Sequence, residues 1–87
     1  MSAVPLLSSL SNQVRLDIVR LLHSEGALSV GEVASKIGQS QPIISRHLII
    51  LRDAGAVTAE AKGPSRIYRV ERAVVRLVNE AEEIVKN

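Results

Sequence analysis

The sequence predicts a single, mostly α-helical domain with one small β-hairpin. Residues 57–62 alternate apolar and polar side chains, as a half-buried strand does, and Gly63-Pro64 supplies a turn into a second strand at 65–70. Eighty-seven residues are enough for one small domain, so we treat residues 1–87 as a unit. Elsewhere, apolar residues recur at the 3.6-residue helical period in four stretches, at about 13–24, 30–37, 41–54 and 72–86.

Composition excludes several functional classes. The chain has no cysteine, which excludes disulfides, thiol redox sensing and thiolate metal sites. Its one aromatic residue, Tyr68, argues against single-stranded nucleic acid as a ligand, because such ligands stack their bases on several rings. The start of the chain lacks the pattern of a secretion signal, and no stretch approaches 18 apolar residues. We therefore expect a cytoplasmic protein that does not enter a membrane.

Two helices are expected in the N-terminal part of the chain. Residues 5–10 form a short apolar segment that begins at a proline. Asn12 is a candidate N-cap for a helix at about 13–24, whose wide apolar face suits the centre of a core. Gly26 ends this helix, and residues 27–29 are either an extended connector or a very short strand.

The most specific local pattern spans residues 30–54. Ser29 and Glu32 have the spacing of a capping box, in which each side chain bonds the other residue's backbone N–H at a helix start. Gly38 can take the left-handed conformation that ends this helix, and Ser40 is a new N-cap. Two helices joined by a short turn that contains glycine form a helix-turn-helix. The second helix is expected to bury a stripe formed by Ile44, Leu48 and Leu51.

The first two turns of the second helix carry polar side chains on the opposite face. Gln41 and Ser45 can hydrogen-bond base edges, and Arg46 can hold guanine with two parallel hydrogen bonds. This pattern is typical of a helix that reads the major groove of double-stranded DNA. A solvated helix face with no such role is the alternative.

The hairpin at 57–70 follows this helix directly and is basic. It carries Lys62, Arg66 and Arg69. Residues 39–69 have five basic and two acidic side chains, a net charge of +3, whereas residues 1–38 are neutral. A basic hairpin in this place predicts a wing that contacts phosphates or the minor groove, with an ordinary solvated hairpin as the alternative.

The C-terminal stretch, at about 72–86, has a narrow apolar seam. This helix could pack on its own domain, but we expect it to pair with its copy in a second subunit, beside the helix at about 5–10. Two-fold symmetry would then place two recognition helices roughly 34 Å apart. The expected dimer interface comprises Leu6, Leu7, Leu10, Val74, Leu77, Val78, Ala81, Ile84 and Val85.

In these motifs and their order the chain resembles the ArsR/SmtB family of bacterial and archaeal winged-helix repressors. The resemblance implies a winged helix-turn-helix fold and a homodimer that represses transcription by occupying an operator, with release when an inducer binds. It is carried by Leu10–Leu22, Ser40–Leu48, Leu51–Val57 and, in the hairpin, Gly63, Arg66 and Tyr68.

The resemblance also assigns DNA contacts to individual positions. On the recognition helix these are Ser40, Gln41, Pro42, Ser45 and Arg46. On the wing and the flank they are Val30, Lys62, Gly63 and Arg66.

The sequence departs from the family at its sensor positions. Members that sense soft metals carry cysteines on the helix that matches 30–37, and others use histidines on the C-terminal helix, yet neither residue type occurs there. His23 and His47 lie on different helices, and carboxylates alone do not make a zinc or nickel site. We therefore expect no cofactor, no metal site and no metal or thiol sensing, and leave open an effector that is a small molecule or a protein.

The two rival functions are an enzyme and a protein-binding module. The chain lacks an activated nucleophile, paired acids and a phosphate-binding glycine loop, so we expect no enzymatic activity. A winged helix that binds proteins, with little or no specific affinity for DNA, is the stronger alternative. Ile49 falls where a recognition helix would face solvent, and it could either widen the core or form a contact patch.

Overall fold

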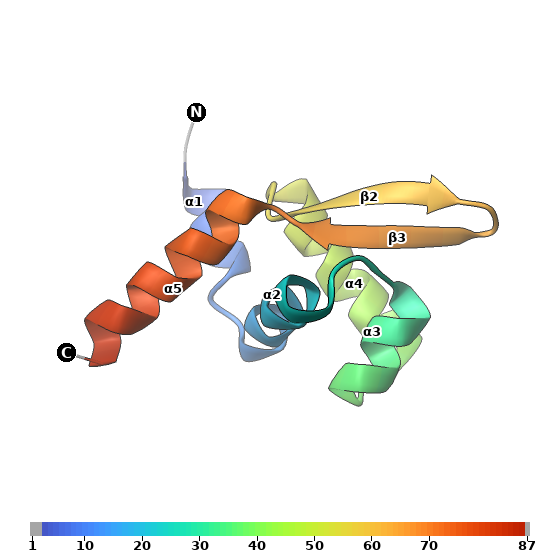
Figure 1. The fold of residues 1–87 in the computed structure, drawn as a ribbon, viewed down its shortest axis with the longest axis horizontal. Coiled ribbons are helices and arrows are strands. Elements are labelled where there is room, and N and C mark those ends of the chain that lie inside the picture. The colour runs from blue at the N-terminus through green and yellow to red at the C-terminus, as the bar shows by residue number, and fades with distance from the viewer. Residues whose placement is uncertain (1–2, 87) are drawn as a thin grey trace.

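The computed structural model describes residues 3–86, which form five helices and a three-stranded sheet (Figure 1). The predicted fold class, a mostly helical winged helix-turn-helix, is confirmed; of the predicted domain, residues 1, 2 and 87 lie outside the described range. None of the described helices is long and apolar enough to cross a membrane. In chain order the elements are α1 (Val4–Ser9), α2 (Gln13–Glu25), β1 (Leu28–Ser29), α3 (Val30–Ile37), α4 (Gln41–Asp53), β2 (Val57–Lys62), β3 (Ser65–Val70) and α5 (Arg72–Lys86).

The caps predicted from local sequence are present. The Ser29 hydroxyl accepts from the Glu32 N–H at 3.2 Å, and the Glu32 carboxylate accepts from the Ser29 N–H at 2.9 Å, which completes the capping box of α3. Gly38 ends α3 with φ of +83°. The Asn12 side chain likewise caps α2 by accepting from the Arg15 N–H at 3.1 Å. The starts of α2 and α3 are therefore each set by residues within three positions of them.

The sheet contains one strand more than a hairpin. β2 and β3 pair antiparallel, with Ala59 opposite Tyr68, and β1 pairs with the other edge of β3, with Leu28 opposite Tyr68. Of the two readings of 27–29, the short strand is therefore the correct one. A two-stranded hairpin is marginally stable by itself, so β1 fastens the base of the wing to the segment between α2 and α3.

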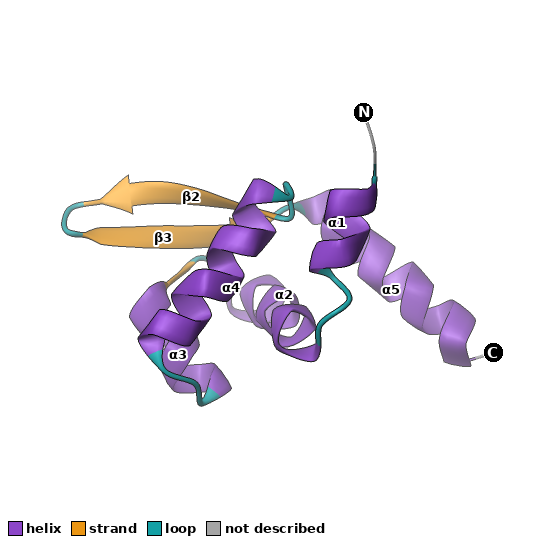
Figure 2. Cartoon of the chain, turned by 180° about the vertical axis from the view of Figure 1, so that it is seen from behind, coloured by secondary structure: helices purple, strands orange, loops and turns teal. Residues whose placement is uncertain are grey.

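The core lies between α2, α4 and the base of the sheet. The predicted stripe of α4 faces inward, and Ile18 of α2 and Tyr68 of β3 are 0% and 2% exposed. Figure 2 shows α4 on the face toward the viewer and α5 on the far face, with α2 between them. With its inner face buried, α4 presents its opposite face to solvent. The fully buried residues of that stripe are Ile44, Leu48 and Leu51.

The first turns of the C-terminal helix pack on their own domain, whereas the subunit interface expected for this helix stays a prediction. Val74 and Val78 are 4% and 6% exposed within their own protomer, and Leu10 is 9% exposed. These three residues thus belong to the protomer core, because α5 follows β3 directly and its first turns pack back on the domain. The last turns extend beyond the core, and there Ile84 and Val85 are 76% and 86% exposed.

Candidate nucleic-acid interface

The first two turns of α4 form the centre of the candidate interface. Gln41, Pro42 and Arg46 are exposed and Ser45 is half-buried. Ser40 caps the helix by accepting from the Ile43 N–H at 3.4 Å. The predicted recognition residues therefore share one exposed helix end, held by a cap at its start and by the buried stripe beneath it.

The first turn of α3 lies beside the first turn of α4. A Cβ atom placed on Gly31 would meet the Gln41 Nε2 atom at 3.4 Å, so the Gln41 side chain extends over the backbone of α3. Val30, the preceding residue, is half-buried and packs partly against the core. Its role as a DNA contact stays a prediction.

The wing extends away from the body of the domain, toward the same side as the α3–α4 turn (Figure 1). Lys62, Gly63 and Arg66 are all exposed at or next to its tip. Gly63 has φ of +60°, a conformation that residues with a Cβ atom rarely adopt. The tip therefore presents two cations around a tight turn.

Arg69 does not belong to the wing tip. It lines a hollow of about 600 Å³ together with Arg72 and Arg76, between the C-terminal end of α2 and the start of α5. Figures 1 and 2 place α5 and α4 toward opposite faces of the molecule. The basic excess of residues 39–69 is thus divided between two surfaces.

A polar linkage that the sequence did not reveal connects α1, α2 and α4. The Arg15 Nε atom donates to the Ser9 carbonyl at 2.5 Å, and Arg15 Nη1 lies 3.3 Å from His47 Nδ1. Because a guanidinium only donates, this ring nitrogen accepts, which requires a neutral imidazole. Burial, followed by the charges of Arg15 and Arg46, holds the pKa of His47 below its ordinary value of 6.5.

Among residues 3–86, no group of three or more His, Cys, Asp and Glu side chains is placed to hold a metal ion. His47 contacts Arg15, whereas His23 is exposed on α2. The outer face of α4 is instead rich in isoleucine, since Ile43, Ile49 and Ile50 are 41%, 41% and 39% exposed. Ile49 therefore does not widen the core, and sequence reasoning had not singled out Ile43.

Comparison with known proteins agrees with this geometry. Residues 10–60 match the model of a helix-turn-helix domain family. The chain is 39% identical over 67 residues to the arsenical resistance operon repressor of Escherichia coli K12, and 41% identical over 75 residues to the biofilm growth-associated repressor of Xylella fastidiosa. These alignments cover 77% and 85% of the chain, which spans 57% and 65% of the respective repressors.

A solved structure is similar over nearly the whole chain. It is the homodimeric winged helix-turn-helix DNA-binding domain of a possible ArsR-family regulator, fragment 1–100, from Mycobacterium bovis. The two share 27% identity with a TM-score of 0.86, over 95% of this chain and 77% of that one. The chain belongs to the ArsR/SmtB family of winged helix-turn-helix transcriptional regulators.

Proposed function

We propose that this chain binds double-stranded DNA as a homodimer and regulates transcription by occupying an operator with inverted half-sites. The observation that carries the proposal is the exposed start of α4, where Gln41, Ser45 and Arg46 occur together on a helix whose other face is buried. The N-terminal turns of a recognition helix are the part that reaches base edges in the major groove.

Each predicted contact has a chemical counterpart on DNA. Gln41 can make two hydrogen bonds to adenine, Arg46 can make two to guanine, and the Ser45 hydroxyl can donate or accept. Lys62 and Arg66 at the wing tip would contact phosphates, which position the protein without reading sequence. Gly63 lets the wing backbone come close to the duplex, because it has no side chain.

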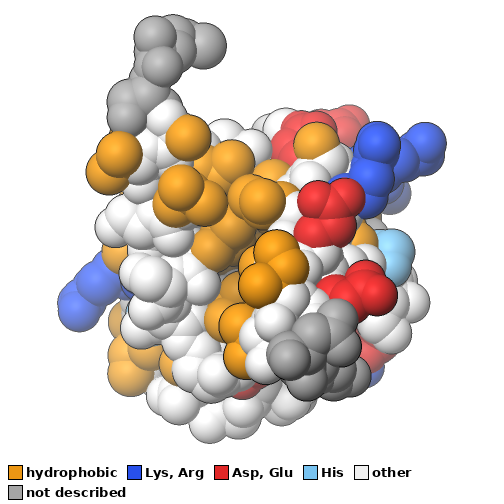
Figure 3. Space-filling view, turned by 90° about the vertical axis from the view of Figure 1, so that its left-hand side faces the viewer, with side chains coloured by type: hydrophobic (Ala, Val, Ile, Leu, Met, Phe, Trp, Pro, Cys, Tyr) orange, Lys and Arg blue, Asp and Glu red, His pale blue; other side chains and the backbone are white. Residues whose placement is uncertain are grey.

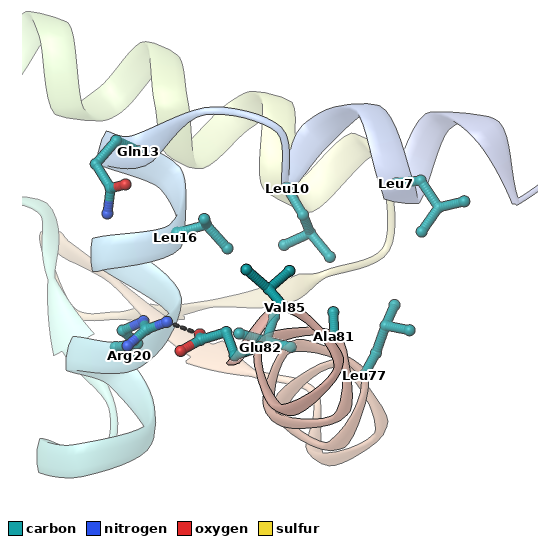
Figure 4. Close-up of a pocket in the computed structure, with 10 residues that line it drawn as sticks. Leu7, Leu10, Gln13, Leu16, Arg20, Leu77, Ala81, Glu82 and Val85 are labelled. Atoms are coloured by element: carbon teal, nitrogen blue, oxygen red, sulfur yellow. Dashed lines mark ion pairs between the residues drawn. The ribbon is translucent and has the colours of Figure 1, made fainter. Parts of the chain in front are cut away.

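The dimer in this proposal forms on an apolar surface made by α1 and α5, which Figure 3 shows as a group of hydrophobic side chains. Leu7, Ile84 and Val85 are 52%, 76% and 86% exposed there. Beneath them lies a hollow of about 500 Å³, with an ion pair between Arg20 and Glu82 at one end (Figure 4). We propose that a second copy covers this surface, as the Mycobacterium bovis relative is homodimeric.

We propose repression as the direction of regulation, since the Escherichia coli and Xylella relatives are named repressors. A dimer seated on a promoter excludes other proteins from the same base pairs, and it would do so in the cytoplasm beside the chromosome. We also propose that release needs no metal, because the chain has no cysteine and its described residues bring no three His, Asp or Glu side chains together. Adding zinc to the protein–operator complex should leave the affinity unchanged, and zinc-dependent release would contradict this part of the proposal.

The test is to select bound duplexes from a random pool of double-stranded DNA. The affinity for the selected duplex is then measured as a function of salt concentration. We expect an inverted repeat with half-sites roughly 34 Å apart and a steep log–log salt slope. A duplex with one half-site serves as control and should bind more weakly. Binding without sequence enrichment that vanishes at physiological salt would instead favour the protein-interaction function.

A further inference from the structure

Three large aliphatic side chains on α4 lie outside the buried core. Ile43 and Ile49 are each 41% exposed and Ile50 is 39% exposed, whereas Ile44 and Leu48 on the inner face are 0% exposed. A β-branched residue on an exposed helix face adds no helix propensity. The isoleucines therefore point to a surface that meets something else.

Neighbouring residues distinguish the three isoleucines. Ile50 lines a hollow with Pro5 and Ser8, so it belongs to the contact between α1 and α4. Ile49 lies six residues beyond Ile43, about 9 Å further along the helix axis. Only Ile43 lies within the first turn of α4, where its N–H donates to the Ser40 cap.

Ile43 is also placed next to Arg46, one of the predicted base-reading residues. It precedes Arg46 by three residues, a spacing at which two side chains are neighbours on a helix surface. Both are exposed, and among the described residues Arg46 forms no ion pair that would draw it away. Ile49 has the same spacing on the other side of Arg46, so Ile43 is distinguished by its place in the first turn, the part of a recognition helix that reaches base edges.

We propose that Ile43 reads a thymine by packing on its 5-methyl group, beside the base pair that Arg46 contacts. This inference rests on the proposed function, since it assigns a specificity determinant to the same helix. In the major groove only thymine presents an apolar group, whereas the other base edges present hydrogen-bond donors and acceptors. An aliphatic side chain against those edges would remove water without replacing its hydrogen bonds, so Ile43 also disfavours cytosine at this position.

A protein partner is the other conceivable occupant of this surface, and the charges argue against it. The isoleucine adjoins Arg46, and the wing tip on the same side of the molecule adds Lys62 and Arg66. A cationic surface around a small apolar patch complements a duplex, which combines phosphates with thymine methyl groups.

The test replaces each thymine of the selected operator by deoxyuridine, which removes the methyl group and keeps base pairing. At one thymine position, this replacement should weaken wild-type binding about fourfold when it is made in one half-site, which is the value for one buried methyl group. When both half-sites are changed, binding should weaken about 15-fold. Ile43→Ala should abolish the sensitivity at this position. Circular dichroism of the variant verifies that the fold is kept.

Ile49→Ala is the matched control, because it removes the same side chain with the same exposure from the same helix. It should keep the uracil sensitivity of the wild type. The assignment is overturned by an operator that shows no uracil-sensitive thymine, by unchanged sensitivity in Ile43→Ala, or by loss of sensitivity in Ile49→Ala. If an operator is selected but one of these results is found, only the assignment of Ile43 fails and the proposed DNA-binding function remains. If no operator can be selected, the assignment and the proposed function are both overturned.

Discussion

Arg46 is the residue on which sequence reading by α4 depends most. It is exposed at the centre of the outer face and forms no ion pair within the described part of the chain. Arg52, the other arginine of α4, is half-buried and pairs with Asp53 at 3.3 Å. The guanidinium of Arg46 is therefore free to make the two parallel hydrogen bonds that select guanine.

Replacing Arg46 by alanine should weaken operator binding by about 1–3 kcal/mol per half-site and relax the choice of one base pair. The cause is the loss of a bidentate contact, and the exposed position leaves folding intact. Fluorescence anisotropy with the operator and its single-base variants measures both effects. Arg69→Ala is the control, because it removes the same charge at a position away from the wing tip, and it should change the affinity little. Equal losses of affinity in the two variants would mean that Arg46 contributes only its positive charge and does not read a base.

His47 makes the stability of the fold depend on pH. Its pKa is lowered by burial and by the charges of Arg15 and Arg46, so the unfolded chain binds this proton more tightly than the folded chain. The free energy of unfolding should therefore be fully retained above pH 6.5 and fall as the pH drops through the lowered folded value. Urea titrations from pH 8 to pH 5 measure the slope.

His47→Gln should remove this part of the pH dependence. His23→Gln, on the exposed side of α2, does not touch Arg15 and serves as the matched control. Glu32 does not interfere, because its pKa is lowered by its bonds with Ser29 and its contribution is lost only below about 4.5. An unchanged slope in His47→Gln would mean that the contact with Arg15 does not depend on the neutral ring.

At the scale of elements, local sequence patterns predicted most of the helices and strands. The capping box of Ser29 and the alternation of 57–62 were readable because cap and strand are decided within a few residues. Contacts between residues far apart in the sequence could not be predicted in this way. Arg15 and His47 are 32 residues apart, and nothing in the sequence marks Leu28 as the partner of Tyr68 or separates the buried from the exposed half of α5. The candidate DNA-contact residues came from local pattern and family resemblance, whereas Ile43 emerged only from its exposure.

The wing is the element whose role can be tested apart from base reading. Lys62→Ala should weaken binding about equally for all duplexes and lower the log–log salt slope by about one per half-site, because one phosphate contact is lost. Affinities measured from low to physiological salt give the slope. Arg72→Ala, on α5, is the control and should leave it unchanged. A change in base preference instead would assign Lys62 to the minor groove.

At the scale of the whole molecule, two surfaces lie at different ends of a small body. The described chain measures 43 × 29 × 20 Å, with the wing and the α3–α4 turn toward one end and the exposed turns of α5 toward the other (Figure 1). A domain of this size buries only about 60–65% of its unfolded surface, so a second copy on α1 and α5 adds stability. The same pairing would orient two α4 helices toward successive turns of a duplex.

Ile84→Glu should therefore convert the dimer to a monomer and weaken operator binding with it. Ile84 is 76% exposed in the protomer, so its replacement disturbs the proposed subunit contact without opening the core. Light scattering measures the mass of the particle, and circular dichroism verifies that the fold is kept. Fluorescence anisotropy measures the affinity for the operator. Asn79→Glu adds the same charge to another exposed position of α5, beside Arg72 and Arg76, and should remain dimeric. If Ile84→Glu stays dimeric, the subunits pair through another surface. If the variant is a monomer but binds the full operator as tightly as the wild type, binding to both half-sites does not depend on this dimer.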